Sequence, residues 1–152
     1  MSEIAIVLGS KSDIKYWEES KQYLEFFNLQ ADLQILSAHR TPDKVSEFAH
    51  NARKNGYKVL IAGAGMAAHL AGALAAQSDL PVLGVPLPGG ILDGIDALLA
   101  TVQMPAGIPV ATFAVGTPGM RNACIFAVEI LSLYNPELKK RLESFKNKGA
   151  KL

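Results

Sequence analysis

Short apolar runs alternate with longer amphipathic segments along the chain. The predicted strands cover residues 3–9, 31–37, 57–64, 81–86 and 109–115. The third run is almost continuously apolar, which is typical of a strand in the middle of a parallel sheet that is covered on both faces. The predicted helices lie around residues 14–27, 42–56, 67–77, 93–101, 120–133 and 136–146. Thr41 and Pro42 suit the N-cap and the first position of the second helix.

Repeated strand–helix units predict a parallel sheet with right-handed crossovers, and hence a three-layer α/β/α sandwich. The 152 residues fit one domain, expected to span residues 1–152. In such folds ligands bind beyond the carboxyl ends of the strands. The first three predicted strands end in polar or glycine-rich turns, at residues 9–13 (GSKSD), 37–42 (SAHRTP) and 63–69 (GAGMAAH). We therefore expect these three turns to meet at one edge of the sheet.

Composition and charge exclude several classes of protein. One cysteine, Cys124, cannot form an internal disulfide or a Cys-rich zinc site. The net charge of +1 gives no general attraction to nucleic acid. No targeting segment is evident, and Gly and Pro interrupt the longest apolar stretches, so no membrane-spanning helix is predicted. We expect a cytoplasmic protein that binds neither nucleic acid nor membranes.

Charged residues are unevenly distributed along the chain. Residues 59–134 hold only five of the 29 charged side chains, namely Asp79, Asp93, Asp96, Arg121 and Glu129. A small domain on its own could hardly cover such a segment with polar groups. Either the segment is unusually buried, or it packs against other copies of the chain, and we favour self-association.

The first turn offers Ser10, Ser12 and Asp13 at the start of a predicted helix. Hydroxyl groups and backbone N–H groups at a helix N-terminus suit an anion such as phosphate, although the same residues can simply cap the helix. The turn matches neither the Gly-x-Gly-x-x-Gly dinucleotide pattern nor a P-loop. A nicotinamide or ATP site is therefore not expected.

The second and third turns hold the candidates for acid–base chemistry. His39 can exchange protons near neutral pH, and the neighbouring Arg40 offers a fork of donors to phosphate or carboxylate. The glycines at 63 and 65 either let the backbone approach a ligand or serve close packing, and both readings stay open. His69 follows in the same turn. The histidines lack metal-ligand spacing, so no metal site is predicted.

Four motifs occur in order along the chain: GSKSD at 9–13, SAHRTP at 37–42, GAG with AAHL at 63–70, and QMP at 103–105. Together they resemble the class I PurE family, the N5-carboxyaminoimidazole ribonucleotide (N5-CAIR) mutases, over residues 4–133. The resemblance implies a flavodoxin-like three-layer sandwich, a homo-octamer with active sites at subunit contacts, and no metal or organic cofactor. It implies an isomerase of purine biosynthesis that moves a carboxylate on aminoimidazole ribonucleotide (AIR).

The resemblance also implies a role for each candidate residue. Ser12, Ser37 and Arg40 would hold the substrate phosphate, and Asp13 the ribose hydroxyls. Ser10 and the backbone of Gly63, Ala64 and Gly65 would surround the base and the migrating carboxylate. His39 would be the general acid and base, with His69 near the carboxylate.

The sequence departs from the family pattern at Met66, at Ala71 and in residues 88–93, and the chain stops soon after its last predicted helix. Two alternatives stay open. A class II carboxylase would use AIR and free CO2 directly. A non-enzymatic flavodoxin-like domain would be a phosphoacceptor receiver or a flavin carrier, but a receiver needs an acidic cluster where Asp13 stands alone.

Overall fold

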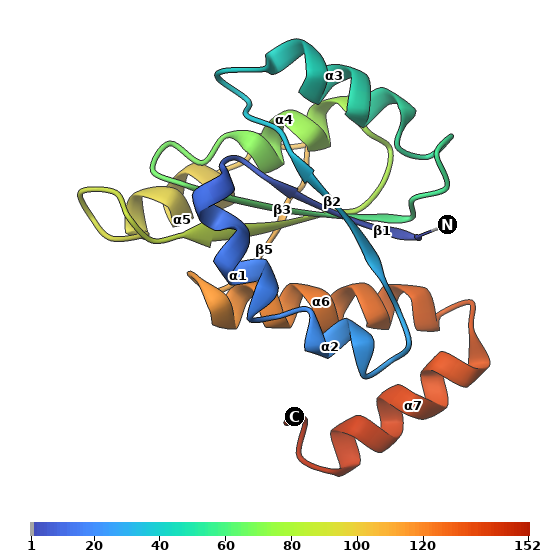
Figure 1. Cartoon of the computed structure of the whole chain (residues 1–152). Coiled ribbons are helices and arrows are strands. Elements are labelled where there is room, and N and C mark those ends of the chain that lie inside the picture. The colour runs from blue at the N-terminus through green and yellow to red at the C-terminus, as the bar shows by residue number, and fades with distance from the viewer. Residues whose placement is uncertain (1) are drawn as a thin grey trace.

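Five parallel strands form one sheet at the centre of the molecule, in a computed structural model that describes residues 2–152 (Figure 1). The strands are β1 (Ile4–Leu8), β2 (Ala31–Ile35), β3 (Val59–Gly65), β4 (Val82–Leu87) and β5 (Ala111–Thr112). Their order across the sheet is β2-β1-β3-β4-β5, and every neighbouring pair is parallel. This is the flavodoxin-like order, in which the chain changes direction across the sheet between β1 and β3.

Helices cover both faces of the sheet. They are the 3-10 helix η1 (Lys11–Asp13) and the α-helices α1 (Ile14–Glu18), α2 (Gln22–Glu25), α3 (Pro42–Asn51), α4 (Leu70–Gln77), α5 (Ile95–Val102), α6 (Thr117–Ser132) and α7 (Pro136–Asn147). Figure 1 shows α3, α4 and α5 on one side and α1, α2, α6 and α7 on the other. The predicted three-layer α/β/α sandwich is confirmed.

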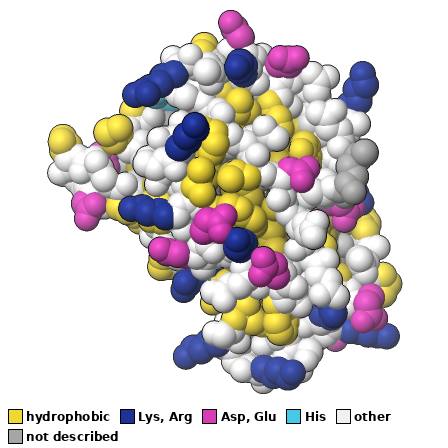
Figure 2. All heavy atoms as spheres, viewed as in Figure 1, with side chains coloured by type: hydrophobic (Ala, Val, Ile, Leu, Met, Phe, Trp, Pro, Cys, Tyr) yellow, Lys and Arg dark blue, Asp and Glu magenta, His cyan; other side chains and the backbone are white. Residues whose placement is uncertain are grey.

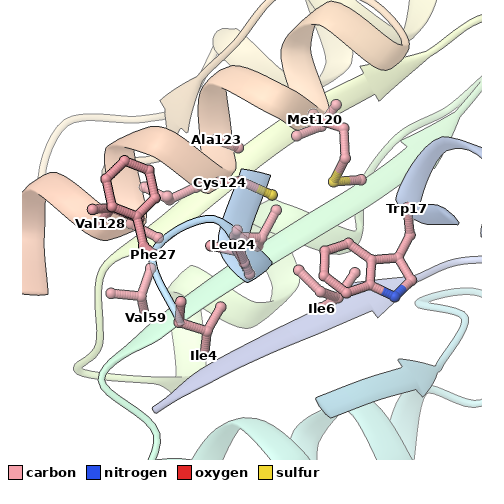
Figure 3. Close-up of a cluster of buried hydrophobic side chains, with 14 of the residues drawn as sticks. Ile4, Ile6, Trp17, Leu24, Phe27, Val59, Met120, Ala123, Cys124 and Val128 are labelled. Carbon is pink, nitrogen blue, oxygen red and sulfur yellow. The ribbon is translucent and has the colours of Figure 1, made fainter. Parts of the chain in front are cut away.

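The alternation of side chains along β1 builds a core on each face. All five residues of β1 are buried. Ile4, Ile6 and Leu8 join the cluster beneath α6, where Figure 3 shows Ile4 and Ile6. Ala5 and Val7 join the cluster beneath α3 and α4. Because burying one such aliphatic side chain contributes roughly 1.5–3 kcal/mol, the two clusters fix the position of β1 and of the turn that follows it.

The helix predicted around residues 14–27 is divided into η1, α1 and α2. Ser20 is buried, and its hydroxyl donates a hydrogen bond to the Tyr16 carbonyl (2.7 Å). Its backbone N–H donates to the Trp17 carbonyl, three residues back (2.8 Å). A serine that bonds to the preceding turn in this way bends a helix, which explains the interruption.

Two further boundaries differ from the prediction. The strand predicted at 109–115 is reduced to Ala111–Thr112, because Pro109 has no N–H to donate to the sheet. The helix predicted from 120 begins at Thr117, with Pro118 in its first turn, where no N–H donor is needed. No helix within the described residues has the length and apolar character needed to cross a membrane.

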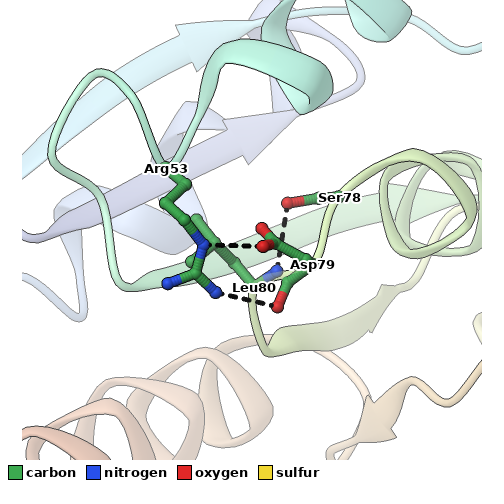
Figure 4. A network of polar contacts seen from close by, with 4 residues as sticks. All are labelled: Arg53, Ser78, Asp79 and Leu80. Atoms are coloured by element: carbon green, nitrogen blue, oxygen red, sulfur yellow. Dashed lines mark hydrogen bonds and ion pairs between the residues drawn. The ribbon is translucent and has the colours of Figure 1, made fainter.

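An exposed polar contact joins the segment after α3 to the segment before β4 (Figure 4). Arg53 Nε donates to Asp79 Oδ2 (2.7 Å), and Arg53 Nη2 donates to the Asp79 carbonyl (3.2 Å). The guanidinium lowers the pKa of the Asp79 carboxyl. Since both side chains are exposed, the pair contributes little to stability. It lies at the opposite end of the strands from the three predicted turns.

Candidate active site

The turns after β1, β2 and β3 lie side by side, because β1 sits between the other two strands. In Figure 1 they lie at the left, where the carboxyl ends of the strands point. Gly9 N–H donates to the Gly63 carbonyl (3.1 Å), which joins the first and third turns. Leu36 N–H donates to the Leu8 carbonyl (2.9 Å), which holds the second turn beside the first. The predicted convergence of the three turns is therefore confirmed.

The hydroxyl groups of the first turn bond to one another. Ser10 Oγ accepts from Ser12 N–H (3.3 Å) and from Ser12 Oγ (2.9 Å), so Ser10 caps η1. Asp13, one of the three possible caps, occupies the N-cap position of α1 but makes no capping hydrogen bond there. Ser10 and Ser12 are exposed and Asp13 is partly buried. The turn presents two hydroxyl groups and one carboxylate to the edge of the sheet.

Partial burial raises the pKa of Asp13, although the backbone N–H of Ser10, the Ser12 hydroxyl and Lys15 act in the opposite direction. The folded state therefore holds a proton on this carboxyl more readily than the unfolded chain does. The ionised carboxyl lowers the free energy of unfolding at neutral pH, and this loss disappears as the pH falls through the folded-state pKa toward the unfolded-state value. A carboxylate that is kept although it lowers the free energy of unfolding is typical of a functional site.

We predict that Asp13→Asn raises the melting temperature slightly at pH 8 and that the difference from wild type shrinks as the pH is lowered. The neutral amide has the same shape and avoids the desolvation of a charge. Thermal unfolding of both proteins between pH 8 and pH 4 measures this. A variant that is less stable than wild type at pH 8 contradicts the role of burial at Asp13.

Ser37 and Thr41 shape the second turn. Thr41 Oγ1 accepts from Ser37 N–H (3.0 Å) and donates to the Ser37 carbonyl (3.1 Å), and Ser37 Oγ accepts from Arg40 N–H (3.1 Å). Thr41 stands at the N-cap position of α3, as predicted, and Pro42 follows it. The capping hydrogen bond itself is absent, because the hydroxyl is engaged with Ser37. This brace fixes the backbone on both sides of His39.

His39 and His69 meet across the edge, although they are 30 residues apart in the chain. His39 Nε2 lies 2.8 Å from His69 Nδ1, and the two rings are nearly perpendicular, with centroids 4.9 Å apart. Both side chains are exposed. In a neutral pair one ring nitrogen donates and the other accepts, so the tautomer of each histidine depends on the other. The sequence indicated both residues but gave no sign of this contact.

Packing inside the folded chain accounts for the two glycines of the third turn. A Cβ at Gly63 would lie 2.9 Å from Leu8 Cδ2, and a Cβ at Gly65 would lie 3.2 Å from the Leu87 carbonyl oxygen. A side chain at position 63 would crowd the Leu8 side chain, and one at position 65 would press on the β4 backbone, so packing favours glycine at both positions. Their role in admitting a ligand, with Ala64 between them, stays a prediction. The same contact places the segment after β4 beside the third turn, a neighbour that the sequence analysis missed.

The third turn extends farther than predicted. The helix expected near 67–77 begins at Leu70, and His69 is its N-cap residue. Ala68 N–H donates to the Met66 carbonyl (2.9 Å), and His69 N–H donates to the Ala67 carbonyl (2.8 Å). Bonds across so few residues cannot continue a helix. The tight turn thus carries His69 to the edge where it contacts His39.

Arg40 is exposed beside this histidine pair. Within residues 2–152 its guanidinium forms no ion pair with an acidic side chain. In the described part of the chain, no three His, Cys, Asp or Glu side chains are grouped so that they could hold a metal ion. The edge thus combines a cationic fork, two imidazoles, several hydroxyl groups and one carboxylate, a set suited to an anionic, polyhydroxylated substrate and to proton transfer.

The sequence model of one protein family, described as AIR carboxylase, matches residues 3–151. The chain belongs to the AIR carboxylase family. Membership confirms the resemblance found in the motifs, and the strand order agrees with the flavodoxin-like fold that it implied.

Individual relatives in the AIR carboxylase family agree with this assignment. The chain is 51% identical over 145 residues to the N5-carboxyaminoimidazole ribonucleotide mutase of Haemophilus influenzae, covering 95% of this chain and 88% of that protein. It is 47% identical to the protein of the same name from Pyrococcus abyssi, covering 96% of this chain and 83% of the relative. The crystal structure of Treponema denticola PurE superposes with a TM-score of 0.86 at 26% identity, covering 97% of this chain and 90% of that one.

Proposed function

We infer that this member of the AIR carboxylase family is an N5-CAIR mutase of de novo purine biosynthesis. The observation that carries the proposal is the direct contact of His39 with His69 where the three turns meet, in a chain that is 51% identical to a protein named as this mutase. The relatives' names favour the mutase over both the class II carboxylase and the non-enzymatic domain.

The proposed reaction moves a carboxyl group from the exocyclic nitrogen of the substrate to a ring carbon, which gives 4-carboxy-AIR (CAIR). The carbamate C–N bond breaks, its electron pair stays on nitrogen, and nitrogen takes a proton from His39. The electron pair at the ring carbon then forms a bond to the released CO2, and the proton on that carbon returns to His39. One imidazole that first gives and then takes a proton serves both steps. No step uses a metal or an organic cofactor.

We propose that the other residues of the edge bind the ribonucleotide. Ser12, Ser37 and Arg40 hold the phosphate, and Asp13 accepts hydrogen bonds from the ribose hydroxyls. Ser10, His69 and the backbone of residues 63–65 surround the base and the moving carboxyl group. The exposure of Arg40 without an acidic partner among the described side chains supports its role, because a guanidinium that is not paired with a carboxylate can donate hydrogen bonds to a phosphate.

The test of the proposal is a comparison of two substrates. The purified protein is given N5-CAIR in one assay, and AIR with bicarbonate in another. We expect rapid formation of CAIR from N5-CAIR, and formation from AIR only at high bicarbonate concentration. Efficient use of AIR at low bicarbonate, without use of N5-CAIR, identifies a class II carboxylase instead.

We further propose that the chain assembles as a homo-octamer in the cytoplasm. Among residues 2–152 of the single chain, twelve large hydrophobic side chains are exposed, and nine of them fall within the charge-poor residues 59–134. Three lie at helical spacing along one face of α5, the α5 stripe: Ile95, Leu99 and Val102. Ile91 and Leu92 are exposed in the turn that precedes this helix. Figure 2 shows hydrophobic side chains at the left edge of the molecule, where Figure 1 places the loop before α5. Such a stripe is typical of a surface that another copy covers.

We predict that Leu99→Asp dissociates the assembly into smaller species. A charge in the α5 stripe removes the stabilisation from burying the leucine side chain, about 1.5–3 kcal/mol in each contact between chains. It also adds the unfavourable free energy of removing a carboxylate from water. Light scattering at micromolar concentration should give about eight times the chain mass of 16.2 kDa for wild type and a lower mass for the variant. Leu152→Asp is the control, since Leu152 is 51% exposed, Leu99 is 52% exposed, and Leu152 lies outside the stripe. A wild-type monomer contradicts the proposal.

A further inference from the structure

The turn after β4 is built around one half-buried carboxylate, that of Asp96 in the first turn of α5. Asp96 Oδ1 accepts hydrogen bonds from the backbone N–H groups of Gly94 (3.2 Å) and Ala97 (3.0 Å). A Cβ at Gly90 would overlap Asp96 Oδ2 and would lie 2.8 Å from Asp96 Cγ. The carboxylate therefore lies against the backbone at both Gly90 and Gly94.

These contacts do more than stabilise the start of α5. An acidic side chain in the first turn of a helix commonly interacts with the N–H groups there, and the bond to Ala97 is of that kind. The bond to Gly94 and the contact at Gly90 fix the segment that precedes the helix instead. Loss of the carboxylate would remove the acceptor of the Gly94 N–H and open a space beside Gly90. The path of residues 88–94 thus depends on Asp96.

The turn after β4 borders the candidate active site. A Cβ at Gly65 would lie 3.2 Å from the Leu87 carbonyl oxygen and 3.5 Å from the Pro88 carbonyl oxygen. A Cβ at Gly94 would lie 3.4 Å from Pro88 Cα. A continuous series of contacts therefore links Asp96, through Gly94 and Pro88, to Gly65. Gly65 is one of the residues proposed to surround the base.

The proposed orientation of the ribonucleotide points its base toward this turn. Its phosphate is proposed to lie at the turns after β2 and β1, and its base at the turns after β1 and β3. The strand order is β2-β1-β3-β4-β5, and neighbouring strands lie about 4.8 Å apart. A substrate that crosses the sheet edge from β2 to β3 therefore directs its ring and carboxyl group toward β4. The next backbone in that direction is the turn at residues 88–94.

We propose that residues 88–94 form an end wall of the substrate site on the side of the base, and that Asp96 is the positioning residue that holds this wall. The inference rests on the proposed mutase function, because the orientation of the substrate comes from it. The wall is formed by the path of the backbone. It therefore requires no particular side chains at residues 88–93, where the sequence departs from the family pattern.

The test compares the binding of two ligands, AIR and ribose 5-phosphate, which lacks the base. Affinity for AIR is measured by isothermal titration, and the weaker affinity for ribose 5-phosphate by ligand-observed nuclear magnetic resonance. Asp96→Ala should bind AIR about tenfold more weakly than wild type, since the displaced wall no longer contacts the base. Its affinity for ribose 5-phosphate should be unchanged, because the phosphate and ribose ligands lie in other turns. A general loss of stability would not separate the two ligands in this way.

Two further variants separate the position of the wall from the charge of Asp96. Asp96→Asn keeps a side-chain oxygen that can accept both backbone hydrogen bonds, so it should bind AIR like wild type. Gly90→Ala keeps Asp96 but places a methyl group where the carboxylate lies, so it should weaken AIR binding as Asp96→Ala does. Gly90 is not among the glycines with positive φ, so only this lack of space opposes the methyl group.

Glu137→Ala is the matched control. Glu137 is also an acidic residue in the first turn of a helix, but α7 lies away from the turns that form the candidate site (Figure 1). Its replacement should leave the affinity for both ligands unchanged. Melting temperature and light scattering establish that each variant is folded and has the mass of wild type.

The outcomes separate this inference from the proposed function. A folded Asp96→Ala protein with the AIR affinity of wild type overturns the role of Asp96, and so does an equal loss of affinity for both ligands. If Asp96→Ala does not fold, Gly90→Ala decides by the same comparison. A wild-type protein that binds AIR but forms no CAIR from N5-CAIR overturns the mutase function alone. A wild-type protein that binds neither ligand overturns both.

Discussion

Replacing His39 with Asn is expected to lower turnover at saturating substrate by at least about 10²-fold, the lower end of what a positioned acid or base contributes. Asn keeps a polar side chain of similar reach but cannot titrate near neutral pH. Because His39 is exposed and lies outside both hydrophobic clusters, the variant should fold, assemble and bind substrate. The measurements are turnover per folded molecule and the melting temperature.

His50→Asn is the matched control for this variant. His50 is also exposed, but it lies within α3, and its Nδ1 is 2.8 Å from the Ser46 carbonyl oxygen. Its replacement should leave turnover within a small factor of wild type. If His39→Asn keeps near-normal turnover, or if it only lowers the melting temperature, the proton transfers belong to another group. His69 is then the first to test.

Replacing Arg40 with Ala should weaken binding of the ribonucleotide by about 1.5–3 kcal/mol, which is roughly a 10- to 150-fold rise in Kd. The lost contact is a charge-assisted one to phosphate, and the exposed Arg40 side chain has little part in the core. Isothermal titration with AIR measures the effect, while the melting temperature should change little.

Arg53→Ala serves as the control for Arg40. Arg53 follows α3, at the other end of the strands, and pairs with the exposed Asp79 (Figure 4). Losing this pair should cost little stability and leave substrate affinity unchanged. Equal affinity of Arg40→Ala and wild type for AIR places the phosphate elsewhere.

The sheet and its turns could be predicted because their signals are local. The run at residues 57–64 is apolar except for Lys58, and most of it lies in the central strand β3 (Val59–Gly65). The run at 109–115 has a similar composition, yet only two residues pair, because Pro109 and the position at the sheet edge limit the hydrogen bonds. The interruption of the first helix at Ser20 depends on a side-chain bond to Tyr16, which no hydrophobic pattern reveals.

In the candidate site, too, the features with a local sequence signal could be predicted, and those that depend on side-chain contacts could not. The topology of parallel strands predicted that His39 and His69 lie at the same edge of the sheet. Their 2.8 Å contact depends on the tight turn at residues 66–69, which the sequence pattern did not reveal. Thr41 was correctly placed before α3, whereas its hydroxyl turned out to brace Ser37. The left-handed φ of Met66 is a property of that turn and has no signature in residue type, since methionine does not favour this conformation.

The most direct test of the mutase assignment follows the carboxyl carbon itself. N5-CAIR labelled with 13C in its carbamate is incubated with the wild-type protein in unlabelled buffer, and the products are examined by 13C nuclear magnetic resonance. The account predicts that the label moves to the carboxylate on the ring carbon of CAIR faster than free bicarbonate accumulates. Label that appears only as bicarbonate, at the rate of spontaneous breakdown without enzyme, would contradict it.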